Sequence, residues 1–207
     1  MAAAPSDASA FVSGEPALLH SRSEREWREA VSGCGLVELT TPRLRFVVSS
    51  WRRYGNRFDL DNLVGPILGV VGADRSLLRS VWATVEVGPV PGVEIGEAAV
   101  PPAPAPAVRV HLASAPRRSV RSVERLVELE GHEPVGGDAP CGCSITLGPE
   151  TAGIVFGFEG PVKPTIDALW PLLGGAGHAP ADHRIQDLRV CVDDTVGVGV
   201  AVWELES

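Results

Sequence analysis

Two segments of similar amino-acid sequence, one in each half of the chain, limit the folds that this protein can adopt. The first segment spans 58–66 and the second spans 156–164. Apolar, helix-like runs follow them at 67–71 and 165–169. A pattern that recurs in this way predicts repeated structural units, so internal repeats are considered before any single fold.

The apolar residues around both segments predict the same order of elements in each half: strand, helix, strand, strand, helix, strand. Ser23 and Glu26 form a capping-box pattern that predicts the first of these helices. A corresponding helix is expected at 119–130. The strands are expected at 10–12, 36–39, 44–48, 81–87, 108–112, 144–147, 153–156, 188–192 and 196–205.

A segment rich in proline, alanine and glycine divides the chain. It spans 91–107 and is predicted to be a linker. The first unit is then 9–90, the second is 108–207, and 1–8 form a loose N-terminus. The predicted fold class is α/β (α+β), with two similar units that each contain a small mixed sheet and two helices.

Composition excludes several classes of protein. Hydrophobic residues make up 44% of the chain, which is too many for a wholly disordered protein. No run approaches the ~20 apolar residues of a membrane helix, and the N-terminus lacks the basic start of a secretory signal, so a cytoplasmic protein is expected. Cys141 and Cys143 are closer than zinc-ligand spacing allows, so no zinc is expected.

The first segment contains two aspartates, Asp59 and Asp61. In extended backbone their side chains would point the same way, because strand side chains repeat every two residues. Two such carboxylates can hold a hard divalent cation such as Mg²⁺. The competing interpretation is that Asp61 or Asn62 only caps the helix that follows.

The two segments together resemble the RusA-like Holliday junction resolvases. That family carries the pattern D-L-D-N-L-x-K-P-x-x-D-A-L, and this chain divides it between its halves: 59–64 matches the first part and 162–169 the second. The stretch 180–185 is similar to the acidic loop of the family, and 188–192 to the strand after it. Lys163, the only lysine of the chain, stands at the family's lysine position.

RusA-like enzymes are homodimeric α/β proteins that cut four-way DNA junctions with a divalent metal and several aspartates. The resemblance therefore implies a single-chain pseudodimer and a metal-dependent endodeoxyribonuclease that acts on branched DNA in recombination and repair. Carried over by position, Asp59, Asp61 and Asp74 would bind Mg²⁺ or Mn²⁺, and Lys163 would join them in catalysis. Further oligomerisation is left open.

Departures from the family pattern leave three alternatives. Gly65 replaces the lysine in the first half, and Gly157 and Glu159 replace two aspartates in the second. Glu159 and Asp182 are then interpreted as remnants of a second site. The chain is either a nuclease with at most one site, an inactive module that binds nucleic acid or protein, or a protein whose two halves share one composite site with Lys163.

The distribution of charge gives mixed indications about DNA binding. The net charge is −8, which opposes phosphate binding and favours the inactive alternative. An arginine strip without any acidic residue nevertheless precedes the aspartate pair, and it is either a DNA-binding surface or a solvated face. The strip consists of Arg43, Arg45, Arg52, Arg53 and Arg57. His183, next to Asp182, is interpreted as a solvated loop histidine.

Overall fold

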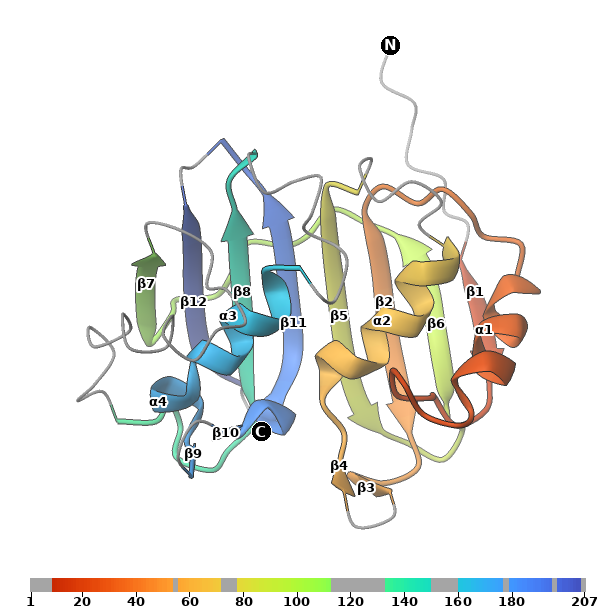
Figure 1. The fold of residues 1–207 in the computed structure, drawn as a ribbon, viewed down its shortest axis with the longest axis horizontal. Helices are drawn as coiled ribbons and strands as arrows, with labels where there is room; N and C mark the ends of the chain where they lie inside the picture. Colours follow the sequence, from red (N-terminus) through yellow and green to blue (C-terminus); the bar gives the residue numbers. More distant parts are fainter. Residues whose placement is uncertain are drawn as a thin grey trace.

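The computed structural model describes residues 9–53, 56–71, 78–112, 133–149, 160–176, 179–194 and 197–205. These residues form one eight-stranded mixed sheet, two short ribbons and four α-helices, which confirms the predicted mixed α/β class. The helices lie on one face of the large sheet (Figure 1). Among the described residues, no helix is both long and apolar enough to cross a membrane.

The elements have the following bounds. The large sheet contains β1 (Ala10–Ser13), β2 (Pro42–Val48), β5 (Ser80–Val87), β6 (Gly92–Glu97), β7 (Val108–Leu112), β8 (Cys141–Leu147), β11 (Ile185–Val192) and β12 (Val198–Glu204). The ribbons are β3 (Arg52–Arg53) with β4 (Asn56–Arg57), and β9 (Gly175–Ala176) with β10 (Ala179–Pro180). The helices are α1 (Glu24–Ser32), α2 (Leu60–Val71), α3 (Val162–Ala168), α4 (Trp170–Leu173) and the 3₁₀ turn η3 (Asp182–Arg184).

The strand order is β1-β6-β2-β5-β11-β8-β12-β7, and the pairing is alike on both sides of the central β5–β11 pair. On one side, β2 is parallel to β5 and antiparallel to β6. On the other, β8 is parallel to β11 and antiparallel to β12. The strands β5 and β11 are antiparallel, with Ala83 opposite Leu188, so they join the two halves into one continuous sheet.

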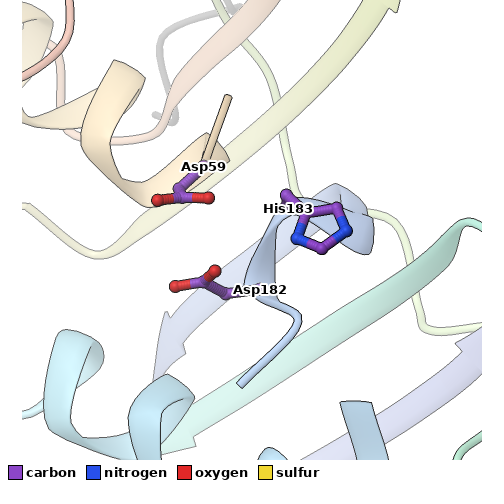
Figure 2. Close-up of side chains that lie close together, drawn as sticks. All are labelled: Asp59, Asp182 and His183. Carbon is purple, nitrogen blue, oxygen red and sulfur yellow. The ribbon is translucent and has the colours of Figure 1, made fainter. Parts of the chain in front are cut away.

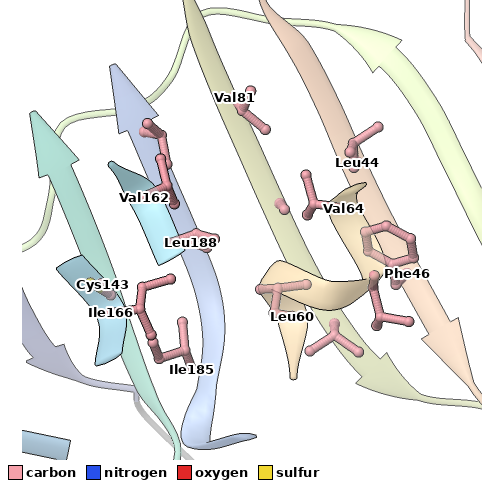
Figure 3. Packing of buried hydrophobic residues seen from close by; sticks show 14 of the residues in the cluster. Leu44, Phe46, Leu60, Val64, Val81, Cys143, Val162, Ile166, Ile185 and Leu188 are labelled. Carbon is pink, nitrogen blue, oxygen red and sulfur yellow. The ribbon is translucent and has the colours of Figure 1, made fainter. Parts of the chain in front are cut away.

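Alternating side chains place the core between the sheet and its helices. Along β2, Leu44 and Phe46 are buried and Arg45 between them is exposed, as expected for a strand with one covered face. Figure 3 shows Leu60 of α2 packed near Phe46. It also shows Ile166 of α3 over the strands of the second half. The helices α2 and α3 therefore cover neighbouring parts of the same apolar face.

Most strands predicted from alternation are present. The structure confirms strands at the positions of β1, β2, β5, β7, β8, β11 and β12. The strand predicted at 36–39 is wrong: Glu38 has a φ of 60°, which interrupts extended backbone. The expectations for 1–8, 119–130 and 153–156 lie outside the described residues.

Strand β6 lies inside the segment predicted as a linker, 91–107. Val93 and Ile95 are buried in alternate positions, and β6 pairs with both β1 and β2. The proline-rich composition of the segment concealed this short alternation. The connection between the sheet halves is therefore shorter than predicted and follows β6.

The predicted capping box of α1 does not form. Ser23 occupies the N-cap position, but its side chain makes no capping hydrogen bond. Instead the Glu24 carboxylate accepts the backbone N–H of His20 at 2.6 Å. This bond connects the preceding loop to the helix start but does not replace the capping box, and the carboxylate in the first turn also interacts favourably with the helix dipole.

A buried ion pair within β11 lies on the sheet face away from the helices. Arg189 donates two hydrogen bonds to Asp187, of 3.1 and 2.6 Å, and further bonds to the carbonyls of Pro101 and Pro102. Its guanidinium lies 5.8 Å from the ring centroid of Trp82. The Trp82 indole N–H also donates to Asp187, at 3.0 Å. The connection after β6 is thereby attached to β11, and β11 to β5.

We expect Arg189→Leu to lower the free energy of unfolding by about 3–5 kcal/mol, because it leaves the Asp187 carboxylate buried without its cation. Urea unfolding of the purified protein measures this loss. The control is Arg45→Leu, which removes a half-exposed arginine that pairs with Glu86 at 2.5 Å. Exposed pairs contribute about 0–1 kcal/mol, so equal losses in the two variants would contradict a structural role for the buried pair.

Candidate functional site

Charged side chains gather where the first turns of α2 and α3 meet η3. Asp59 immediately precedes α2, and Asp61 lies in its first turn. Lys163 lies in the first turn of α3, and Asp182 begins η3. Because β5 pairs with β11, the helices that cover these strands come together, and residues from both halves of the chain share one site.

The start of α2 fixes the positions of the two aspartates. The Asp59 carbonyl accepts the N–H groups of Asn62 and Leu63, at 3.0 and 3.2 Å, and the Asn62 side chain donates to Asp59 Oδ2 at 3.2 Å. The prediction of extended backbone through both aspartates is therefore wrong, because Asp61 is helical. The capping alternative was also assigned to the wrong residue, since Asp59 is the residue at the helix start.

Lys163 is the centre of the cluster. Its Nζ lies 3.2 Å from Asp61 Oδ2, 3.1 Å from Asp167 Oδ1 and 3.0 Å from Asp182 Oδ2. Burial lowers the pKa of Lys163, but Asp61, Asp182 and Asp167 outweigh it and raise the pKa. The side chain is therefore a fixed ammonium group between three carboxylates.

Asp61 is the most deeply buried member of the cluster, with 2% of its surface exposed. Burial raises the pKa of Asp61, and the charge of Lys163 opposes this effect. Although Lys163 Nζ is within ion-pair distance of Oδ2, this oxygen accepts no well-directed hydrogen bond from the described residues. A buried carboxylate oxygen in this state retains the capacity to accept a hydrogen bond or to face a cation.

Asp59, Asp182 and His183 form a second group of potential ligands beside the lysine. One ligand atom from each lies within 4.8 Å of the others, and all three residues are half-buried. Figure 2 shows the carboxylates of Asp59 and Asp182 facing each other, with the His183 ring beside them. The pKa of Asp59 is raised to about 7, mainly by burial and further by the charges of Asp182 and Asp61, against the opposing charge of Lys163.

The structure brings together most of the site residues expected from the sequence. Asp59, Asp61 and Lys163 lie in one cluster, and Asp182, interpreted above as a remnant of a separate site, lies in the same cluster. Asp74 and Glu159 lie outside the described residues.

Two residues of the site were missed or interpreted differently. His183 is half-buried beside Asp59 instead of solvated, because η3 turns it toward the start of α2. Asp167 was not singled out, although its position four residues after Lys163 on one helix was a usable signal.

The arginine strip does not form one surface beside the site. Arg43 and Arg45 project from the sheet face opposite the helices, where Arg43 lies 5.2 Å from the Trp82 ring centroid and Arg45 pairs with Glu86 and Glu94. Strand alternation places them there, because Leu44 between them faces the core. The remaining arginines of the strip belong to the ribbon β3–β4, which leads directly to Asp59.

Comparison with known proteins gives no matching family model, no similar curated protein and no similar solved structure. The chemistry of the site is therefore argued from its residues. Carboxylate oxygens and an imidazole nitrogen are ligands for divalent metals, and a fixed ammonium group beside them can contact an anion. These groups have the chemistry to bind a metal ion and to contact an anion.

We expect the free energy of unfolding of the metal-free protein to fall by about 2 kcal/mol as the pH rises from about 4 to 7. The folded protein keeps a proton on Asp59, whose pKa is raised from 3.8 to about 7, whereas the unfolded chain loses it earlier. The folded state therefore binds more protons in this range, and raising the pH removes that advantage. Urea unfolding at a series of pH values measures the slope.

The matched variant is Asp59→Asn, which cannot ionise and should lose most of this decline. Glu97 acts with the opposite sign, because backbone hydrogen bonds from Thr40 lower its pKa and its contribution is lost as the pH falls below about 4.5. The difference between the slopes of wild type and Asp59→Asn is therefore the contribution of Asp59 to the pH dependence. An identical slope in both proteins would mean that Asp59 ionises normally.

Proposed function

We propose that this chain is a RusA-like, metal-dependent endodeoxyribonuclease that acts on branched DNA of the Holliday junction type, with one composite site. The observation that carries the proposal is the convergence of Asp59, Asp61, Lys163 and Asp182. They come from the segments in which the sequence resembles the family. The composite site is the alternative that agrees with this geometry.

The residues of the cluster divide the work of phosphodiester hydrolysis. Asp59 and Asp182 would hold the divalent ion, since their carboxylates face each other. When bound, the ion supplies an activated water and neutralises charge on the phosphate. Lys163 would stabilise the negative charge that develops on the scissile phosphate. Asp61 and Asp167 hold its ammonium group in position.

A duplicated fold would account for the single site. The strand order has the same pairing pattern on both sides of β5–β11, so that β2 corresponds to β8 and β6 to β12. In addition, α2 precedes β5 as α3 precedes β11. These correspondences support a pseudodimer of two RusA-like units. Gly65 in place of the lysine then explains why only one half supplies the ammonium group.

DNA would approach over the ribbon β3–β4. This ribbon carries Arg52, Arg53 and Arg57 and ends two residues before Asp59. Their positive charge, a few residues before Asp59 in the sequence, would offset part of the unfavourable net charge of −8. Arg43 and Arg45 are not part of this surface, because they lie on the other face of the sheet.

The test is incubation of the purified protein with a labelled four-way DNA junction and a matched linear duplex, in Mg²⁺ or Mn²⁺. We expect cleavage of the junction in preference to the duplex, and none with a chelator. Asp59→Asn, Asp182→Asn and Lys163→Met should each reduce cleavage on the order of 10²-fold or more, because each removes a group from the reacting centre.

The control is Asp138→Asn, which changes an exposed aspartate in the turn before β8 and should cleave like wild type. Cleavage that persists in Asp59→Asn would identify a contaminating nuclease and reject the proposal. Junction binding without any cleavage would instead support the inactive, nucleic-acid-binding alternative.

A further inference from the structure

His183 gives the site a nitrogen donor that the aspartate pattern alone does not contain. Its ring lies with Asp59 and Asp182 in one group of potential ligands. We propose that His183 is a ligand of the divalent ion and that the site prefers a first-row transition-metal ion such as Mn²⁺ to Mg²⁺. This inference rests on the metal site of the proposed function, but not on DNA cleavage.

The preference follows from the donor set. Mg²⁺ favours oxygen ligands in strict octahedral geometry and keeps several of its waters. Imidazole nitrogen binds first-row transition metals more strongly, in the order Mn²⁺ < Fe²⁺ < Co²⁺ < Ni²⁺ < Cu²⁺ > Zn²⁺. Replacing one oxygen by the His183 nitrogen therefore weakens the competition from Mg²⁺ and strengthens binding of the transition metal.

The geometry is compatible with one shared ion. Ligand atoms on opposite sides of an ion are separated by about 4.4 Å when each bond is about 2.2 Å. The ligand atoms of Asp59, Asp182 and His183 lie within 4.8 Å of one another, which is close to this upper limit for ligands of one ion. Lys163 Nζ donates to Oδ2 of Asp182 at 3.0 Å, so the ammonium group lies directly beside the three potential ligands.

In the part of the chain that the structure describes, acidic side chains outnumber basic ones around Lys163. Among the described residues, Asp59, Asp61, Asp167 and Asp182 surround the single ammonium group of Lys163. Asp61 is 2% exposed, and its Oδ2 has Lys163 Nζ at 3.2 Å but accepts no well-directed hydrogen bond from the described residues. Buried charges are ordinarily paired or coordinate metals, and a divalent ion beside the lysine would complete the charge balance of this cluster.

The experiment is a titration of the metal-free protein with Mn²⁺, in which calorimetry and electron paramagnetic resonance measure binding. A parallel calorimetric titration uses Mg²⁺. We expect wild type to bind Mn²⁺ at least about tenfold more tightly than Mg²⁺. His183→Ala should weaken Mn²⁺ binding by about tenfold or more and change Mg²⁺ binding by less than about threefold. The control His111→Ala, an exposed histidine on the edge strand β7, should bind both ions like wild type.

A spectroscopic readout makes the test independent of how well the variant folds. Bound Mn²⁺ in wild type should show hyperfine coupling to an imidazole nitrogen, which carboxylate ligands cannot produce. Absence of this coupling, or equal affinities for the two ions, overturns the inference. If bound Mn²⁺ shows nitrogen coupling but the protein cleaves no DNA, the metal site is supported and the proposed nuclease is rejected.

Discussion

The antiparallel pairing of β5 with β11 is the interaction on which the rest of the molecule depends. On one face it is reinforced by the hydrogen bond from Trp82 of β5 to Asp187 of β11, and Arg189 of β11 pairs with the same carboxylate. On the other face it brings α2 beside α3, and with them Asp61 beside Lys163. The β5–β11 pairing thus supports the Arg189–Asp187 ion pair on one face of the sheet and the candidate site on the other.

The two ionic clusters differ in how completely their charged groups are paired and hydrogen-bonded. Arg189 is paired with Asp187, hydrogen-bonded to backbone carbonyls and flanked by aromatic rings. Around Lys163, in contrast, carboxylates outnumber cations and the pKa of Asp59 is raised by burial and by its neighbours. Buried charges contribute little net stability, and strongly perturbed carboxylates gather at functional sites. The second cluster therefore fits a functional role better than a structural one.

Sequence patterns predicted the parts of the structure that depend on neighbouring residues. The alternation around Leu44 and Phe46 gave β2 correctly, and the family pattern drew attention to Asp59, Asp61 and Lys163. The pattern could not show that Lys163 meets Asp61, because that contact requires the pairing of distant strands. His183 was misinterpreted for the same reason: its neighbour Asp59 belongs to the other half of the sheet.

The wide chain separation of the contacts across β5–β11 also has a consequence for folding. Trp82 and Asp187 are 105 positions apart, so their meeting closes a long loop at an entropic cost that only later contacts compensate. High contact order of this kind slows folding, and the cluster around Lys163 assembles only when the two halves dock. Neither half made alone would contain the cluster, so the ion pair of Lys163 with Asp61 is an indicator that the two halves have docked.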